Sequence, residues 1–294
     1  MKQVLFIYNP VAGTGRVRKN LYEIVDFYNS QEYLITLCPV RKLEEFFGKS
    51  NYAKKEYDRI VCSGGDGTLN IVLTYFKRIN CSEPIAYIPS GSTNDYACSL
   101  GIPENFNEAL IKTLEGETKQ FDIGKFNEQY FLYVAGFGMF TNVSYNTSQK
   151  FKNLLGHTAY LLEGIRQLSE IKSYHMTVVS DDKVYEGDFI LGLVTNSVSI
   201  GGFKTLIPRD VELDDGMFEM ILIRTPKSFA ELQEVIVSLV GEKLQDNKEV
   251  IYCKTRHLEI VADEELEWTL DGEYGGKHKQ VHIVNLEKNV EIFV

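Results

Sequence analysis

The fold is decided by one stretch of the chain, Arg59-Ile60-Val61-Cys62-Ser63-Gly64-Gly65-Asp66-Gly67-Thr68. It begins with a short apolar run, which has the length and composition of a buried β-strand. The run enters a loop with three glycines around one carboxylate. An amphipathic helix follows, with apolar residues at helical spacing: Leu69, Val72, Leu73 and Phe76. A strand, a glycine-rich loop and a helix in this order predict a parallel α/β unit that binds its ligand at the carboxyl end of the strand.

The same order occurs twice more in the first part of the chain. An apolar run over 4–8 precedes Asn9-Pro10-Val11-Ala12-Gly13-Thr14-Gly15, and a run over 85–88 precedes Pro89-Ser90-Gly91-Ser92-Thr93-Asn94-Asp95. Each loop alone could be an ordinary turn with a helix cap. Glycine lets the main chain approach a phosphate closely, and helix N-termini offer free N–H groups. Three such loops at one sheet edge therefore indicate a nucleotide site.

The remaining elements fall into two groups. Apolar spacing predicts one amphipathic helix over 17–28 and a strand over 34–37 in the first part. The second part is mostly strand-like, with β-branched or alternating residues between Gly, Asp and Asn turns. Its predicted strands cover 130–135, 176–179, 189–195, 218–223, 251–253, 258–262, 266–270 and 281–285, and its predicted helices cover 154–168 and 229–240.

This pattern predicts an α/β plus β protein of two domains, in keeping with 294 residues. Residues 1–123 should form a parallel-sheet nucleotide-binding domain. Residues 124–285 should form a predominantly antiparallel, β-sandwich-like domain. The tail, about 286–294, is expected to return to the first domain. No linker rich in Ser, Gly or Pro separates the two.

The charge balance excludes several classes of protein. Lys plus Arg is 31 and Asp plus Glu is 41, which gives a net charge of −10. An acidic chain is a poor nucleic-acid binder, because phosphate neutralisation requires a basic surface. We expect neither a signal peptide nor a spanning helix, since no apolar run has the required length. The five cysteines are scattered without a C-x-x-C pair and indicate a reducing, cytoplasmic setting.

The three loops together resemble the motif set of the diacylglycerol kinase catalytic-domain family, which includes bacterial lipid kinases and the sphingosine and ceramide kinases. The motifs are Asn9-Pro10-x-x-Gly13, Gly64-Gly65-Asp66-Gly67-Thr68 and Pro89-x-Gly91-x-x-Asn94-Asp95. The resemblance continues through a Phe131–Gly138 strand, Leu213-Asp214-Asp215-Gly216-Met217-Phe218 and Leu270-Asp271-Gly272-Glu273. It spans nearly the whole chain, in order.

The resemblance implies a first domain like those of NAD kinases and diacylglycerol kinases, and an ATP-dependent lipid kinase that uses Mg²⁺. The γ-phosphate would go to a hydroxyl of diacylglycerol or a related lipid. The nucleotide contacts carried over by position are Asn9, Pro10, Val11, Ala12, Gly13, Arg41, Gly64, Gly65, Asp66, Gly67, Thr68, Leu69, Asn70, Ser92 and Asn94.

Acidic residues carry the remaining roles in the resemblance. Glu273 matches the family's proton acceptor, and a carboxylate is a suitable general base for a hydroxyl. Asp66 would assist by orienting the nucleotide or its metal. Asp215 matches a magnesium ligand, with main-chain oxygens of Glu212 and Met217, and Asp95 joins the metal network; a hard cation prefers such oxygens. Taken singly, Asp271-Gly272 and Asp215-Gly216 could also be plain hairpin turns.

Two alternatives share some of these motifs. A NAD kinase-like enzyme that phosphorylates a nucleotide also carries Gly-Gly-Asp-Gly-Thr, but the segment 90–95 fits the lipid-kinase pattern better. A nucleotide- or lipid-sensing pseudokinase would be expected to lose Asp66, Asp215 or Glu273, and all three are present. The five histidines fall in none of these motifs.

The expected partners are ATP and a lipid substrate, without nucleic acid. The lipid would be met by brief peripheral contact with the membrane surface through apolar residues, because no basic anchor is evident. A homodimer occurs in the family and is the assembly that the resemblance suggests.

Overall fold

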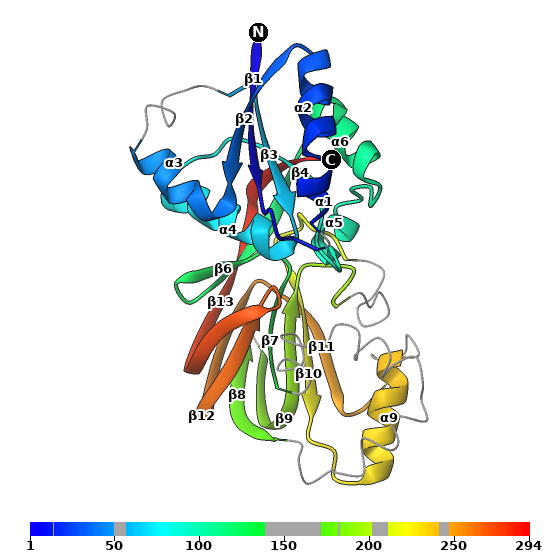
Figure 1. Cartoon of the computed structure of the whole chain (residues 1–294). Coiled ribbons are helices and arrows are strands. Elements are labelled where there is room, and N and C mark those ends of the chain that lie inside the picture. The colour runs from blue at the N-terminus through cyan, green and yellow to red at the C-terminus, as the bar shows by residue number, and fades with distance from the viewer. Residues whose placement is uncertain (14, 50–56, 139–171, 182, 202–210, 241–246) are drawn as a thin grey trace. The chain divides into compact units, whose positions relative to one another are not determined.

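The computed structural model describes residues 1–13, 15–49, 57–138, 172–181, 183–201, 211–240 and 247–294 (Figure 1). They divide into two compact units. Unit 1 comprises residues 1–121 and 288–294, and unit 2 comprises residues 122–287. The helix predicted over 154–168 lies outside the described residues.

Unit 1 is built on a parallel sheet. Its strands are β1 (Lys2–Tyr8), β2 (Tyr33–Pro39), β3 (Arg59–Gly64) and β4 (Ile85–Pro89), in the spatial order β2-β1-β3-β4. Each neighbouring pair runs parallel. The end of β13 (Glu273–Phe293) extends this sheet, where Ile292 and Phe293 pair in parallel with β4.

Helices cover this sheet because each carries an apolar face. Helix α2 (Leu21–Ser30) packs on β2, α4 (Asp66–Arg78) on β3 and α6 (Phe106–Glu115) on β4. Shorter helices are α1 (Arg16–Lys19), η1 (Val40–Lys42), α3 (Leu43–Lys49) and α5 (Asp95–Ser99). The single helix predicted over 17–28 is wrong, because Asn20, at φ −103° and ψ 13°, separates α1 from α2.

Unit 2 is rich in strands. They are β5 (Thr118–Phe126), β6 (Gln129–Phe131), β7 (Val134–Gly138), β8 (Tyr174–Ser180), β9 (Lys183–Thr195), β10 (Phe218–Arg224), β11 (Val250–Thr255), β12 (His257–Leu270) and β13. The described part of unit 2 also contains helix α9 (Phe229–Val240). Strands β6 to β12 pair antiparallel with their neighbours. The two long strands β9 and β12 pair with β8 in one half and with β7 in the other. Strands that change partners in this way allow sheets to form a layered, sandwich-like core.

Two predictions in unit 2 identify strands but divide them wrongly. The strand expected over 130–135 is divided into β6 and β7, because the N–H groups of Leu132, Tyr133 and Val134 donate to the Asp271 carboxylate instead of to a strand. The strands expected over 258–262 and 266–270 are one strand, β12, whose register shifts between Val261 and Leu266.

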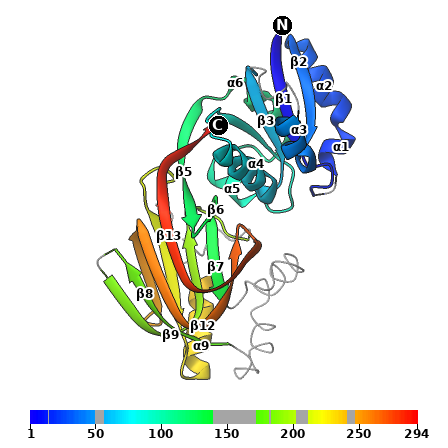
Figure 2. The same cartoon turned by 90° about the vertical axis from the view of Figure 1, so that its left-hand side faces the viewer.

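Strands β5 and β13 each begin in one unit and end in the other. Figure 2 shows β13 as a single long strand that ends at the C-terminus. No helix in the described part of the chain is long and apolar enough to cross a membrane.

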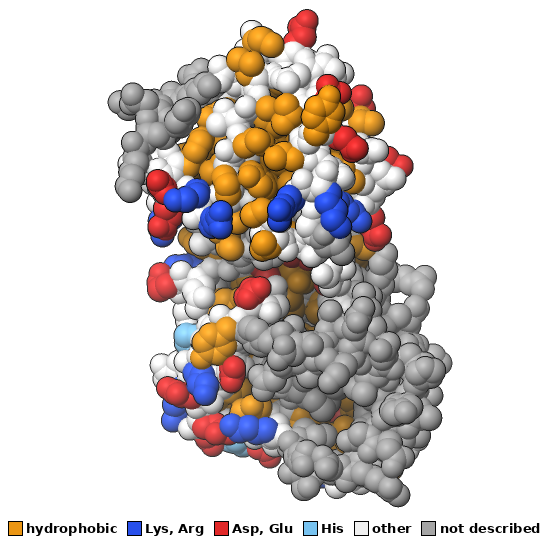
Figure 3. All heavy atoms as spheres, viewed as in Figure 1, with side chains coloured by type: hydrophobic (Ala, Val, Ile, Leu, Met, Phe, Trp, Pro, Cys, Tyr) orange, Lys and Arg blue, Asp and Glu red, His pale blue; other side chains and the backbone are white. Residues whose placement is uncertain are grey.

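Apolar side chains also reach the surface of unit 1. Figure 3 shows them gathered over the side of the sheet near β2, with Lys and Arg along one border. Leu34 and Leu37 of β2 are 46% and 36% exposed, and Tyr22 of α2 is 80% exposed. Unit 1 therefore has apolar side chains in contact with solvent.

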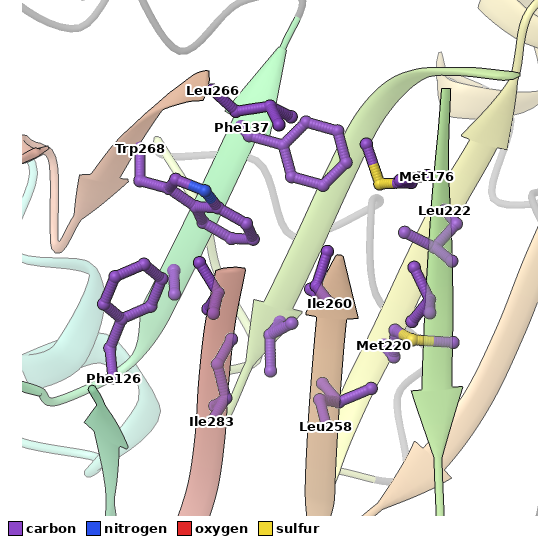
Figure 4. Packing of buried hydrophobic residues seen from close by; sticks show 14 of the residues in the cluster. Phe126, Phe137, Met176, Met220, Leu222, Leu258, Ile260, Leu266, Trp268 and Ile283 are labelled. Atoms are coloured by element: carbon purple, nitrogen blue, oxygen red, sulfur yellow. The ribbon is translucent and has the colours of Figure 1, made fainter. Parts of the chain in front are cut away.

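The core of unit 2 centres on the only tryptophan, Trp268, which is buried (Figure 4). Its ring centroid lies 5.0 Å from that of Phe126 and 4.9 Å from that of Phe137. Leu258 and Ile260 of β12 face the same cluster, as does Ile283 of β13. The opposite face of β12 and β13 is therefore directed to solvent.

Candidate functional site

The loops after β1, β3 and β4 lie at one edge of the unit 1 sheet. These strands are parallel neighbours, so their carboxyl ends meet at the same edge. The loop after β1 is joined to the start of α4, because Asn9 Nδ2 donates to Thr68 Oγ1 at 3.1 Å. Asn9 Oδ1 also accepts from Val11 N at 3.1 Å. Asn9 therefore orders its own loop and connects it to the next one.

Glycines allow these loops to touch through their main chains. A Cβ on Gly13 would lie 2.4 Å from the Ser90 carbonyl oxygen, and a Cβ on Gly91 would lie 2.6 Å from Gly65 Cα. Gly13 also has a φ of +54°, which favours glycine. Any side chain at these positions would separate the loops. The close approach leaves main-chain N–H groups of three loops at one edge of the sheet.

Asp66 is the first residue of α4 and is buried, with 8% of its surface exposed. Its Oδ2 accepts from the N–H of Asp95, the first residue of α5, at 2.8 Å. Its Oδ1 lies 3.4 Å from the Tyr87 hydroxyl. The Asp66 carboxylate thus accepts an N–H at the start of α5 that has no partner within that helix. This hydrogen bond connects the second loop to the third.

The third loop contains a buried hydroxyl that the sequence reasoning passed over. Ser90 is 3% exposed, and its Oγ has no hydrogen-bond partner in the described part of the structure. Ser92, chosen from the sequence, is exposed. Asn94, in the left-handed conformation, accepts from Gly91 N at 2.8 Å and donates to Gly91 O at 3.3 Å. An unpaired buried hydroxyl is costly, so Ser90 is a candidate ligand contact.

The other predicted nucleotide contacts occupy different settings. Arg41 is exposed on η1, which packs against α4. The side chain of Leu69 is fully buried in the core, so only its main chain could face a ligand. Asn70 accepts from Thr74 Oγ1 at 2.9 Å. Pro10, Val11 and Ala12 lie in the loop after β1, Gly64 is the last residue of β3, and Gly67 is the second residue of α4.

Unit 2 holds a second group of acids near the start of β10. Asp215 Oδ1 accepts from Met217 N at 2.9 Å, and Asp215 Oδ2 lies 3.2 Å from Lys254 Nζ. Lys254 Nζ also lies 3.5 Å from Oε1 of the buried Glu219. Burial raises the pKa of Glu219 to about 7, against the opposing effect of Lys254. Glu212 is exposed.

Asp122 completes this group and was missed from the sequence. It is fully buried, its Oδ2 accepts from Gly216 N at 2.7 Å, and its own N–H donates to Leu213 O at 2.8 Å. Asn196 Nδ2 reaches the same Leu213 carbonyl at 3.3 Å. The turn that carries Asp215 is therefore held at both ends. The sequence does contain a signal that could have identified Asp122, because it is an acidic residue between two apolar ones, Phe121 and Ile123.

Glu273 is the exposed first residue of β13 and follows a tight turn. Asp271 and Gly272 form this turn with φ values of +51° and +84°. The Asp271 carboxylate is buried and accepts the N–H groups of residues 132, 133 and 134 at 2.7, 3.0 and 3.1 Å. Asp271 fixes the turn, and Glu273 projects from it with its carboxylate accessible.

Comparisons with known proteins cover both units. The family description "Diacylglycerol kinase catalytic domain" matches residues 3–126, and "YegS C-terminal NAD kinase beta sandwich-like domain" matches residues 134–287. Diacylglycerol kinase of Bacillus subtilis (strain 168) is 31% identical over 301 residues, covering 99% of each chain. Diacylglycerol kinase of Staphylococcus epidermidis is 31% identical over 293 residues, covering 99% of this chain and 92% of its own.

Solved structures are similar over the same length. A crystal structure from Bacillus anthracis str. Sterne has a TM-score of 0.78 at 27% identity, covering 99% of this chain and 95% of its own. A diacylglycerol kinase structure from the same organism has a TM-score of 0.73 at 24% identity, covering 99% and 96%, and supports the fold alone.

Proposed function

Because the chain belongs to the diacylglycerol kinase catalytic-domain family, we propose that it transfers the γ-phosphate of ATP to a hydroxyl of diacylglycerol or a closely related lipid. The observation that carries the proposal is the meeting of three glycine loops at the carboxyl edge of the unit 1 sheet. Phosphoryl transfer depends mainly on positioning and charge neutralisation, which such an edge can supply.

The triphosphate would lie along these loops. The close contacts at Gly13, Gly65 and Gly91 fit a phosphate, since the main chain there carries no side chain that would keep oxygens away. The unpaired buried hydroxyl of Ser90 fits a hydrogen bond to the nucleotide. Asn9 and Asn94 order the loops. The other nucleotide contacts proposed from the family motifs are Pro10, Val11, Ala12, Arg41, Gly64, Asp66, Gly67, Thr68, Leu69, Asn70 and Ser92.

Magnesium would use oxygen ligands at the Asp215 turn of unit 2. The proposed set is the Asp215 carboxylate and the main-chain oxygens of Glu212 and Met217, which are of the type that Mg²⁺ prefers. Asp95 is proposed, from the family motifs, to join the metal network through water. Lys254, 3.2 Å from Asp215 Oδ2, is the present positive partner of that carboxylate. A cation bound there would replace Lys254 in this role. Magnesium would supply charge neutralisation during phosphoryl transfer.

Glu273 is the proposed general base. Its carboxylate would accept the proton of the lipid hydroxyl as the hydroxyl oxygen bonds to the γ-phosphorus. The bond from that phosphorus to the bridging oxygen breaks, and ADP leaves. The exposed position of Glu273 on a turn fixed by Asp271 supports this role, because a base needs both access and a defined direction.

Contact with the bilayer is proposed to be peripheral and brief. The apolar side chains gathered on one face of unit 1 (Figure 3) support contact through apolar groups, as do the exposures of Leu34 and Leu37. We also propose a homodimer by analogy with the family, which light scattering of the purified chain would measure.

Incubation with labelled ATP and Mg²⁺ tests the function. The acceptor panel contains diacylglycerol, monoacylglycerol and a sphingoid base in detergent micelles, together with NAD. We expect label in a lipid and none in NAD. Label in NAD alone would support the nucleotide-kinase alternative, and ATP binding without transfer to any acceptor would support a pseudokinase.

A further inference from the structure

Two histidines and a glutamate meet on the solvent face of unit 2, outside every motif described above. His257 and Glu259 are two residues apart on β12, so both side chains point to the same face. His282 of β13 lies directly opposite Glu259 in the antiparallel pair. The intervening residue, Leu258, points into the core. The topology therefore places three ligand-bearing side chains together on the outer face.

The ligand atoms of these residues converge. His257 Nε2 lies 2.6 Å from His282 Nε2 and 3.7 Å from Glu259 Oε1. One ligand atom from each of the three residues lies within 4.8 Å of the ligand atoms of the other two. Within the described part of the chain, this is the group of histidine and acidic side chains that is close enough to share a metal ion. We propose that His257, Glu259 and His282 bind one divalent transition-metal ion of the Zn²⁺ class.

The distances suit such an ion. With Zn–N bonds of about 2.0 Å in tetrahedral geometry, the two imidazole nitrogens would stand about 3.3 Å apart. The two nitrogens, now 2.6 Å apart, need to separate by about 0.7 Å, which small rotations of the two side chains can supply. Without a cation, two ring nitrogens this close must share one proton as donor and acceptor. A cation accepts both lone pairs at once, and the Glu259 carboxylate offsets its charge.

The main chain around the cluster is fixed before any ion binds. Asn127 and His282 exchange two hydrogen bonds, at 2.9 Å from His282 N to Asn127 Oδ1 and 2.8 Å from Asn127 N to His282 O. The His257 carbonyl accepts from Thr255 Oγ1 at 2.9 Å. Ligands carried on paired strands lose little conformational freedom on binding.

The ligand types select the class of metal. Two imidazoles and one carboxylate suit Zn²⁺ and its first-row neighbours, whereas Mg²⁺ prefers oxygen ligands throughout. The site therefore differs from the magnesium ligands proposed at Asp215. A bound ion would cross-link β12 to β13 and stabilise unit 2.

Calorimetric titration of the full chain, prepared without a polyhistidine tag, with Zn²⁺ alone tests the proposal. We expect one equivalent to bind and to raise the thermal unfolding temperature. His257→Ala and His282→Ala should each weaken binding by more than about 10-fold, the scale seen even for loss of an outer partner. Glu259→Gln, a change confined to an exposed side chain, should weaken binding in the same direction.

His175→Ala is the matched control, because His175 is an exposed histidine of unit 2 that pairs with Asp188 and lies outside the cluster. It should bind Zn²⁺ as the unchanged chain does. Circular dichroism of the metal-free variants verifies their folding. The proposal would be overturned if His282→Ala and Glu259→Gln each bound Zn²⁺ as tightly as the unchanged chain, or if millimolar Mg²⁺ displaced the Zn²⁺.

Discussion

At the scale of single residues, Asp271 and Glu273 are two positions apart and have opposite surroundings. Asp271 is buried and accepts three main-chain N–H groups, whereas Glu273 is exposed. A buried acid with this many partners has a structural role, and an accessible acid is available for chemistry. A substitution of Glu273 should therefore lower turnover without changing stability, and a substitution of Asp271 should lower the stability of the protein.

Glu273→Gln should lower kcat for lipid phosphorylation by about 10²-fold or more, the usual scale for loss of a general base. ATP affinity and the urea midpoint should stay unchanged, because the side chain is exposed. A steady-state assay with saturating ATP measures this. Glu265→Gln, at another exposed glutamate of unit 2, is the control and should keep full activity. Wild-type kcat in Glu273→Gln would rule out the proposed base.

Asp271→Asn should destabilise the protein. The amide oxygen can still accept from Tyr133 and Val134, but the new NH₂ group would face the N–H of Leu132, which Asp271 Oδ2 now accepts. A buried donor left without an acceptor costs about 1–3 kcal/mol. Urea unfolding of the two proteins measures the loss, and an unchanged midpoint would show that the Asp271 carboxylate does not hold the turn.

At the scale of elements, the nucleotide edge depends on loops that touch through glycine. Gly91→Ala would place a Cβ 2.6 Å from Gly65 Cα and force the second and third loops apart. We expect ATP affinity to fall by more than about 10-fold, since a misplaced binding loop is costly to positioning. Calorimetric titration with a non-hydrolysable ATP analogue gives the value.

Gly48→Ala serves as the control for this change. A Cβ on Gly48, in α3, meets nothing within 4 Å, so ATP affinity should stay at the wild-type level. Equal ATP affinity in Gly91→Ala and Gly48→Ala would mean that the contact between the two loops does not shape the nucleotide site.

The β8–β9 pair contains an ion pair, between His175 and Asp188, whose strength depends on pH. His175 and Asp188 are directly opposite, with Nδ1 2.9 Å from Oδ1, and this hydrogen bond raises the pKa of His175 above 6.5. Asp188→Asn should lower it, as an NMR titration of the histidine would report. Because the folded pKa is raised, the pair stabilises the protein fully below pH 6.5, and the effect is lost as pH rises through the folded pKa. No change in the His175 pKa on substitution would contradict this pairing.

The sequence predicted elements best where an apolar run led into a glycine-containing loop, or where apolar residues recurred at helical spacing. The strands expected over 59–62 and 85–88 agree with β3 and β4, and the helix over 229–240 agrees with α9. The sequence failed where a distant side chain decides the main chain. Asp271 takes the N–H groups that would continue β6 into β7, and such a contact over more than 130 residues leaves no periodic signal. Helix α6, with Asn105 as its cap, was missed entirely.

The site was predictable to a similar extent. Glycine spacing identified the three loops, because close approach of main chains requires glycine whatever the rest of the sequence is. It did not identify Ser90 or Asp122, whose significance lies in burial and partners. The Ser90 hydroxyl lacks a partner in the described part of the structure, and Asp122 holds the Asp215 turn. Both facts depend on tertiary packing.

At the scale of the whole molecule, the proposed groups come from both units. Asp66 and Asp95 belong to unit 1, while Asp122, Asp215 and Glu273 belong to unit 2. The chain joins the units through β5 and β13, and the last residues of β13 return to the unit 1 sheet. The net charge of −10 does not favour adsorption to an anionic membrane surface, in keeping with the proposed contact through apolar side chains.

The central claim is phosphoryl transfer from ATP to a lipid hydroxyl. The most direct measurement is mass-spectrometric detection of the product formed from diacylglycerol, Mg²⁺ and ATP by the wild-type chain. We predict phosphorylated diacylglycerol in an amount equal to the ADP released, and none when ATP is omitted. Release of ADP without any phosphorylated lipid, or conversion of added NAD to its phosphate instead, would contradict the account.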